Sequence, residues 1–199
     1  KTTINNLNMK SYKILLSATL FLFFTCVEGI SFAQTSSWSA DITHSNMGFK
    51  VLHKGVAFTV GEFRDFDLSI KTSDGGFSNA EIELTIDAAS INTSNSSRDN
   101  HLREYFETEQ YPDITFKTNS VTKIDENLYS LMGVFTMHGV SKEIEVQMKH
   151  IGTTQSRGKE IAGLYFTATV NRMDHGVGLD LSSVAPDVQL HADIEIIKK

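Results

Sequence analysis

Apolar and polar residues alternate with a period of two along most of this chain. In one clear example, Ile82, Leu84 and Ile86 alternate with acidic or hydroxyl side chains. Such alternation turns one face of each strand toward a dry core and the other toward water, as in antiparallel sheets. The pattern predicts about eight strands, near residues 47–51, 63–70, 81–87, 114–116, 129–135, 143–149, 164–170 and 188–196. Turn residues between them favour an antiparallel barrel or sandwich over a parallel sheet.

The first 33 residues have the pattern of a cleaved signal peptide and not of a folded element. Met9 is the expected initiator, Lys10 and Lys13 form a basic region, and an apolar run covers residues 14–24. Residues 31–33 (Ser-Phe-Ala) form a small-x-small cleavage site. The apolar run is too short for a membrane span, which needs about 20 residues. Residues 1–33 are therefore expected to be absent from the mature protein.

Residues 34–199 are expected to form one domain that is periplasmic or secreted. No Gly/Ser-rich or Pro-rich linker divides them, and no repeat of roughly 20–50 residues occurs. Cys26 offers an alternative, lipoprotein anchoring, which is less favoured because Phe24 and Thr25 fit such processing poorly. Cys26 is also the only cysteine of the chain. Disulfides therefore cannot stabilise the exported domain, and an apolar core must do so.

Composition and motifs exclude several classes of function. The formal net charge is −6 and basic residues do not cluster, which argues against binding to nucleic acid or anionic lipid. The chain has no GxSxG elbow, no P-loop and no GxGxxG run. Its seven histidines form no short-spaced pair such as HxH. We therefore predict no enzyme, no cofactor and no metal site, and a site assembled from distant histidines or a pH-sensing role remains an alternative.

One polar segment, SRDNHLREYFETEQY at residues 97–111, interrupts the alternation. Ser96 or Ser97 is a candidate N-cap, and Asp99 suits the first turn of a helix. Leu102 and Phe106 lie four residues apart and would share one helix face. Proline at residue 112 disfavours helix in the residue before it. The segment predicts a short helix that closes or flanks one end of the barrel.

Eight strands that close on themselves form a barrel that is either filled by side chains or holds one small ligand. Composition alone leaves both open, because the 13 phenylalanines could build a core or line a pocket.

Eight runs of sequence, in order, resemble those of the YceI-like family. They are DITHS at 41–45, FKVLH at 49–53, VGEF at 60–63, SINT at 90–93, RDNHL at 98–102, YPDITF at 111–116, GVFTMHGVSK at 133–142 and NRMDHG at 171–176.

This resemblance implies an extended, lipocalin-like barrel of eight antiparallel strands around a long apolar channel. Family members are usually secreted or periplasmic, and some carry a polyisoprenoid such as a prenyl quinone or prenyl phosphate without chemistry. The chain departs from the family's commonest residues at Thr43, Phe135, Met137 and His138. His138 is therefore expected to alter one rim of the barrel.

The alternation and the resemblance together predict the ligand-binding residues. The candidates for the apolar channel share the inward parity of their strands, and plain core packing is the alternative for each. They are Phe49, Val51, Phe63, Phe66, Ile82, Leu84, Ile86, Phe116, Leu131, Leu164, Phe166, Val188 and Leu190. The candidates for a polar head group are His53, Arg98, His101 and Arg172, since arginine suits phosphate or carbonyl oxygens.

Simpler alternatives exist for the head-group residues and for the function. Arg98 could pair with Asp99, Arg172 could pair with Asp174, and His53 could be an ordinary interior histidine. A filled barrel would act instead as a protein-interaction module, and a polar mouth could serve a lipid-dependent enzyme. The expected partner is a long apolar small molecule; a second copy of the chain is a further candidate, and no permanent membrane span is expected.

Overall fold

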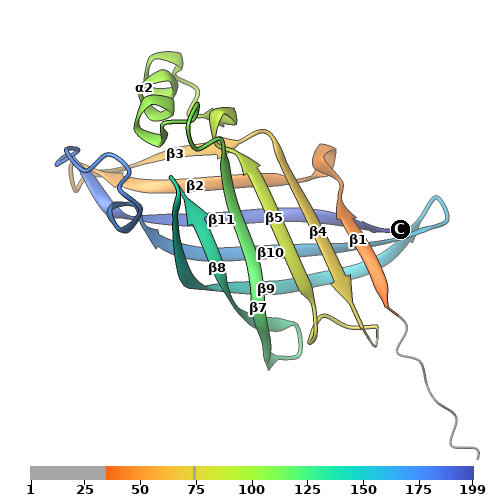
Figure 1. Cartoon of the computed structure of the whole chain (residues 1–199). Helices are drawn as coiled ribbons and strands as arrows, with labels where there is room; N and C mark the ends of the chain where they lie inside the picture. The colour runs from red at the N-terminus through yellow and green to blue at the C-terminus, as the bar shows by residue number, and fades with distance from the viewer. Residues whose placement is uncertain (1–34, 74) are drawn as a thin grey trace, which may run out of the picture. The chain divides into compact units, whose positions relative to one another are not determined.

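A computed structural model describes residues 35–73 and 75–199 of the chain, and it is almost entirely β-structure (Figure 1). The predicted signal peptide lies outside the described residues. The strands are β1 (Ser36–Ala40), β2 (Asn46–His53), β3 (Ala57–Phe63), β4 (Phe66–Thr72), β5 (Glu81–Asp87), β6 (Ile91–Asn92), β7 (Asp113–Asp125), β8 (Leu128–Met137), β9 (Val140–Ser156), β10 (Lys159–Asn171) and β11 (Val184–Lys198). One α-helix, α2 (Ser96–Phe106), and three short 3-10 turns complete the described part of the chain.

A closed antiparallel ring of eight strands forms the barrel, as predicted. The ring runs β1–β4–β5–β7–β8–β9–β10–β11, and β1 closes it by pairing with both β4 and β11. The long strand β11 pairs with β1 through residues 196–198 and with β2 through residues 184–193. β1 and β2 are thus two halves of one bent strand, and β3 and β4 continue each other in the same way.

Local hydrogen bonds explain why these long strands are broken. Between β1 and β2, the Asp41 carboxylate accepts from the Thr43 backbone N–H, and the Ser45 hydroxyl donates to the Asp41 carbonyl. Such side-chain bonds favour a tight turn over a continuous ladder. The predicted strand at 63–70 is interrupted at Arg64 and Asp65, where the chain bonds instead to Ser90 and Asp87. The single predicted strand is therefore corrected to two.

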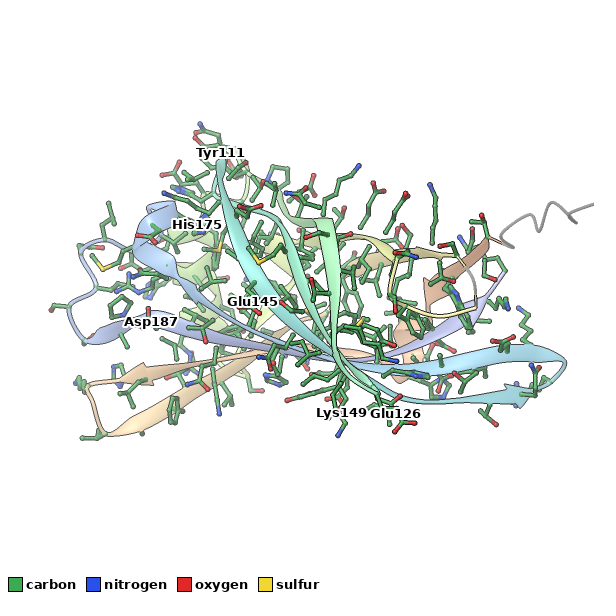
Figure 2. The ribbon with its side chains drawn as sticks, turned by 90° about the horizontal axis from the view of Figure 1, so that it is seen from below. Tyr111, Glu126, Glu145, Lys149, His175 and Asp187 are labelled. Atoms are coloured by element: carbon green, nitrogen blue, oxygen red, sulfur yellow. The ribbon has the colours of Figure 1, made fainter. Side chains whose placement is uncertain are left out.

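One half of the barrel is filled. Trp38, Ile70, Tyr129, Met148 and Ile196 are buried there. Phe77, which precedes β5, packs between the rings of Trp38 and Tyr129, with ring centroids 6.2 and 6.4 Å away. The Trp38 indole N–H donates to the Thr72 hydroxyl at 3.3 Å, so the buried polar group is satisfied. Figure 2 shows Glu126 and Lys149 where the β7–β8 turn meets β9. This half supplies an ordinary packed core.

Helix α2 lies over the other half of the barrel (Figure 1). Its N-cap is Asn95, whose side chain accepts from the Arg98 backbone N–H, and neither Ser96 nor Ser97 plays that part. The helix ends at Phe106, because Glu107 adopts a left-handed conformation with φ 48°, several residues before the predicted stop at Tyr111. Leu102 and Phe106 pack against the core as expected. None of the helices among the described residues is long and apolar enough to cross a bilayer.

Candidate functional site

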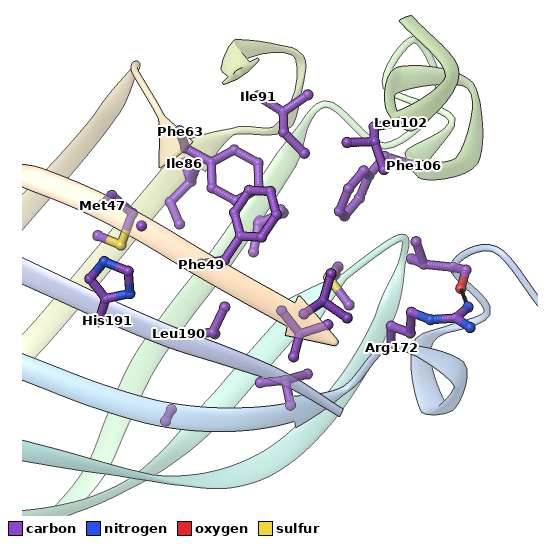
Figure 3. Close-up of a pocket in the computed structure, with 18 of the residues that line it drawn as sticks. Met47, Phe49, Phe63, Ile86, Ile91, Leu102, Phe106, Arg172, Leu190 and His191 are labelled. Atoms are coloured by element: carbon purple, nitrogen blue, oxygen red, sulfur yellow. Dashed lines mark hydrogen bonds between the residues drawn. The ribbon is translucent and has the colours of Figure 1, made fainter. Parts of the chain in front are cut away.

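A cavity of about 620 Å³ occupies the half of the barrel next to α2 (Figure 3). Its walls are inward-facing apolar side chains of the barrel strands, and α2 and the segment between β10 and β11 border it. Ten of the thirteen predicted channel residues line it: Phe49, Val51, Phe63, Ile82, Leu84, Ile86, Phe116, Phe166, Val188 and Leu190. The volume lies within the range of about 300–1,000 Å³ that is usual for small-molecule sites. The barrel is therefore hollow at one end and filled at the other.

Three predicted channel residues lie elsewhere. Phe66, Leu131 and Leu164 are buried, with side chains 6%, 0% and 1% exposed, but they do not line the cavity. They point inward as the alternation requires. Leu131 and Leu164 belong to the packed part of the barrel, whereas Phe66 packs at the cavity end, opposite the lining residue Ile86. Period-two alternation gives the face of a strand, not the depth at which a residue sits along the barrel. Core packing, the alternative for each, describes these three.

Several lining residues were missed by the sequence prediction. Most share the inward parity of a predicted strand and could have been included with it: Met47, Ile114, Phe135, Met137, Ile144, Val146, Ala168, Val170, Ala192 and Ile194. Leu102 and Phe106 were expected to close the end, and they also line the cavity. Val177 and Leu181 come from the β10–β11 connection and Val184 begins β11; no periodic pattern identifies an inward face in the connection.

The predicted head-group residues border the cavity beside α2. His53 ends β2, and Arg98 and His101 lie on the helix. Arg98 donates from Nε to the Thr93 hydroxyl at 2.7 Å and from Nη2 to the Thr93 carbonyl at 2.9 Å. Arg98 is therefore tied to the strand before the helix through Thr93, and the described residues show no pairing with Asp99.

Asp99 anchors the same turn from inside. It is 6% exposed, and its Oδ1 accepts from the Thr93 backbone N–H at 2.8 Å and from the Thr93 hydroxyl at 2.5 Å. These hydrogen bonds, with the charges of Arg103 and Arg98 as smaller causes, hold the pKa of Asp99 below its ordinary value of 3.8. Thr93 therefore forms hydrogen bonds with both Arg98 and Asp99, two neighbouring charged residues of α2. These bonds fix the position of the helix over the cavity.

Replacing Asp99 by asparagine is expected to lower the thermal midpoint at neutral pH, because the acceptor oxygen remains but its charge is lost. The pKa of Asp99 is lowered by folding. The charge therefore stabilises the protein above the unfolded-state pKa and ceases to do so as the pH falls through the lower folded-state pKa. Thermal unfolding at a series of pH values should show the gap between wild type and Asp99→Asn closing in acid. A gap that is constant with pH would contradict this assignment.

Arg172, the fourth predicted head-group residue, also lines the cavity (Figure 3), and its hydrogen bonds go to the protein backbone. It is 6% exposed, and its guanidinium donates to five backbone carbonyls, those of Val177, Gly178, Leu181, Val184 and Ala185. It does not bond Asp174, the partner expected for local pairing. Burial lowers the pKa of Arg172, and the charge of Asp180 opposes that effect. All five of its N–H donors are used in these bonds, which shape the chain between β10 and β11; a role in head-group binding stays a prediction.

His138 connects the end of α2 to the barrel rim. It occupies the β8–β9 turn with φ 52°, and its Nδ1 donates to the His175 carbonyl at 3.0 Å. Its Nε2 lies 3.4 Å from a Glu107 carboxylate oxygen, and its ring packs against that of Tyr111 with centroids 4.8 Å apart. Figure 2 shows Tyr111 and His175 at this end of the barrel. The unusual residue at 138 therefore contributes a contact between helix and rim.

One group of side chains has the composition of a metal site but lies away from the cavity. Asp41, His44 and Glu195 place their ligand atoms within 4.8 Å of one another at the bend between β1 and β2. His44 already bonds Asp41 at 3.1 Å, which raises the pKa of His44 and lowers that of Asp41. His44 is well exposed, and a surface ion pair accounts for the arrangement.

Known proteins match the chain over most of its length. The model of the YceI-like domain matches residues 38–196. A UPF0312 protein of Staphylococcus aureus strain N315 is 30% identical over 164 residues, covering 80% of this chain and 93% of its own. The structure of Burkholderia cenocepacia BcnA superposes with a TM-score of 0.69 at 20% identity, covering 78% of this chain and 98% of its own.

A second solved structure shares the same fold. A polyisoprenoid-binding domain from Saccharophagus degradans, implicated in plant cell wall breakdown, superposes with a TM-score of 0.60 at 20% identity. The match covers 81% of this chain and 97% of that domain. At this level of identity the two structures indicate a common barrel, which agrees with the eight-stranded ring described above. With the family model matched over residues 38–196, the chain belongs to the YceI-like family.

Proposed function

We propose that this protein binds and shields a long apolar lipid of the polyisoprenoid class and stores or transports it within the cell envelope. The observation that carries the proposal is the apolar cavity of about 620 Å³ inside a closed barrel. A polyisoprenoid-binding domain with the same fold supports the class of ligand. Location in the envelope rests on the signal-peptide pattern of residues 1–33.

The chemistry of the cavity suits a prenyl tail. Each CH₂ group transferred from water to an apolar site contributes about 0.8 kcal/mol, so a methyl-branched chain can gain affinity without polar contacts along its length. Aromatic side chains such as Phe49, Phe63 and Phe166 provide broad apolar surfaces against it. The prenyl tail would be held by burial alone, and we propose that the ligand is released unchanged, without catalysis.

Native mass spectrometry of residues 34–199, purified from the exported fraction without detergent, tests the proposal. Organic extraction of the same sample then identifies the bound molecule. We expect a stoichiometric adduct whose mass is that of a prenyl quinone, a prenyl phosphate or a similar long apolar molecule. A protein that carries no adduct and takes up no added prenyl quinone would overturn the proposal and favour a protein-interaction role.

Replacing Arg98 by alanine is expected to weaken binding of a prenyl phosphate about tenfold while changing binding of the matching prenyl alcohol little. The guanidinium borders the cavity and uses only Nε and Nη2 in its bonds to Thr93, and a charged hydrogen bond to phosphate contributes about 1.5–3 kcal/mol. Fluorescence titration with the two ligands gives both affinities. Arg157→Ala, at the exposed β9–β10 turn, is the matched control. Equal loss for both ligands would remove Arg98 from head-group recognition.

A further inference from the structure

Large apolar side chains are exposed on two segments that border the cavity at the α2 end of the barrel. Val56, Phe58 and Val60 lie on the β2–β3 hairpin, and Met173 and Leu179 lie in the connection from β10 to β11. Val56 is 83% exposed and Leu179 61%. In Figure 1 the hairpin and the connection lie together at one end of the barrel, with α2 above them. Exposed apolar side chains that gather beside an apolar cavity are typical of an interaction surface.

The same two segments border the cavity with their inward-facing residues. His53 and Thr59 of the hairpin line it, as do Leu181 and Ser183 of the connection. The exposed side chains therefore lie on the outer side of the chain segments whose inner side contacts the ligand space. We call Val56, Phe58, Val60, Met173 and Leu179 the rim patch.

Backbone hydrogen bonds hold the two segments in fixed positions. Residues 54–56 connect the two strands, and Lys54 and Gly55 reverse the chain with φ 52° and 70°. The Lys54 backbone N–H donates to the Ser183 carbonyl at 2.7 Å and joins the hairpin to the connection. Arg172 in turn holds the carbonyls on both sides of Leu179. Hydrogen bonds thus hold the backbone of the segments that carry the rim patch.

The charges near the patch are mixed. Lysines lie beside its hairpin residues, and the exposed carboxylates of Asp174 and Asp180 follow Met173 and Leu179 in the connection, so a neutral, zwitterionic lipid surface suits it better than an anionic one. Lys50 lies over the Phe58 ring, with Nζ 5.2 Å from the ring centroid, and Lys54 occupies the turn next to Val56. Lysine can keep its ammonium group at lipid head groups while its stem lies along an apolar surface. Apolar side chains flanked by lysine are typical of segments that insert shallowly into a bilayer interface.

We propose that the rim patch docks the mouth of the barrel onto the surface of a lipid bilayer. The inference rests on the proposed function, because it supplies a route for the ligand. A prenyl tail that crossed open water between membrane and cavity would expose every CH₂ group that it later buries. Docking at the mouth lets the tail pass between two apolar phases without that exposure.

Sedimentation with phosphatidylcholine vesicles tests docking directly. The double variant Val56→Ser/Leu179→Ser is expected to lose at least tenfold in vesicle affinity, and the loss should persist at high salt because insertion is apolar. Ile151→Ser is the matched control, since Ile151 is also 61% exposed but lies on β9 outside the rim patch. Wild type and control should bind vesicles equally.

A second measurement separates docking from ligand binding. Prenyl alcohol delivered from cyclodextrin, without vesicles, should bind the double variant as tightly as wild type, whereas uptake from vesicles should slow about tenfold. Wild-type protein that binds the alcohol but not vesicles would overturn docking and leave the proposed function intact. Wild-type protein that binds vesicles but not the alcohol would overturn the proposed function and leave docking intact. A dimer dissolved by the double variant, with unchanged vesicle binding, would assign the patch to contacts between copies and overturn the proposal.

Discussion

Replacing Leu84 by tryptophan is expected to reduce binding of a prenyl quinone at least tenfold while leaving the barrel folded. Leu84 lines the cavity from β5 and is only partly buried, so the larger indole can extend into the hollow half of the barrel. The indole would occupy space that the ligand needs. Each CH₂ group of the ligand that is displaced loses a contribution of about 0.8 kcal/mol. Titration of ligand against the variant measures the loss, and circular dichroism checks the fold.

The neighbouring residue provides the control for this experiment. Thr85 follows Leu84 on the same strand and its side chain is exposed on the outer face. Thr85→Trp adds an indole to the same strand but outside the barrel, so ligand binding should stay at the wild-type value. Unchanged binding by Leu84→Trp, with the fold intact, would mean that the ligand does not occupy this part of the cavity.

Replacing Arg172 by methionine is expected to lower the free energy of unfolding by about 3 kcal/mol or more. The guanidinium satisfies five backbone carbonyls, three in the β10–β11 connection and two at the start of β11, and each buried carbonyl left without a partner costs about 1–3 kcal/mol. Arg172→Lys keeps the positive charge but offers three donors on a compact ammonium, which cannot reproduce the planar group. Urea denaturation should therefore show both variants well below wild type.

Arg157→Met is the matched control, because Arg157 is exposed in the β9–β10 turn and such changes usually stay within about 0.5 kcal/mol. If Arg172→Lys were as stable as wild type, charge and not hydrogen-bond geometry would be what Arg172 contributes. A variant of normal stability that loses only phosphorylated ligands would restore the head-group role predicted from the sequence. Stability and ligand binding must therefore be measured on the same preparations.

The fold was predictable from the sequence because alternation is a local property of each strand. The inward parity of Ile82, Leu84 and Ile86 is visible in the chain and is the same in the barrel. The missed strand β3 shows the limit of that argument. Its outer face carries the exposed apolar residues Phe58 and Val60. The sequence of β3 therefore does not alternate between apolar and polar residues, and it gives no sign of which face points into the barrel.

The site was predictable only in part. The depth of a residue along the barrel, and the hydrogen-bond partner of a side chain, depend on contacts between distant segments. Nothing in the residues around Leu131 and Leu164 indicates that Phe77 and Trp38 help to fill their end of the barrel. Arg172 looked like a head-group ligand because its type suits phosphate. Its actual acceptors are carbonyls 5 to 13 residues further along the chain, and a sequence gives no sign of which carbonyls a folded connection leaves without partners.

The pairing of β11 has a consequence for how the chain assembles during synthesis. β11 follows every other strand in the chain order, yet it is the partner of β1, β2 and β10. Until it emerges, three strands lack a neighbour, and unpaired strand edges favour aggregation. The eight-stranded ring therefore cannot close before residues 184–198 have been added to the chain, and the barrel must form after synthesis of β11 rather than strand by strand.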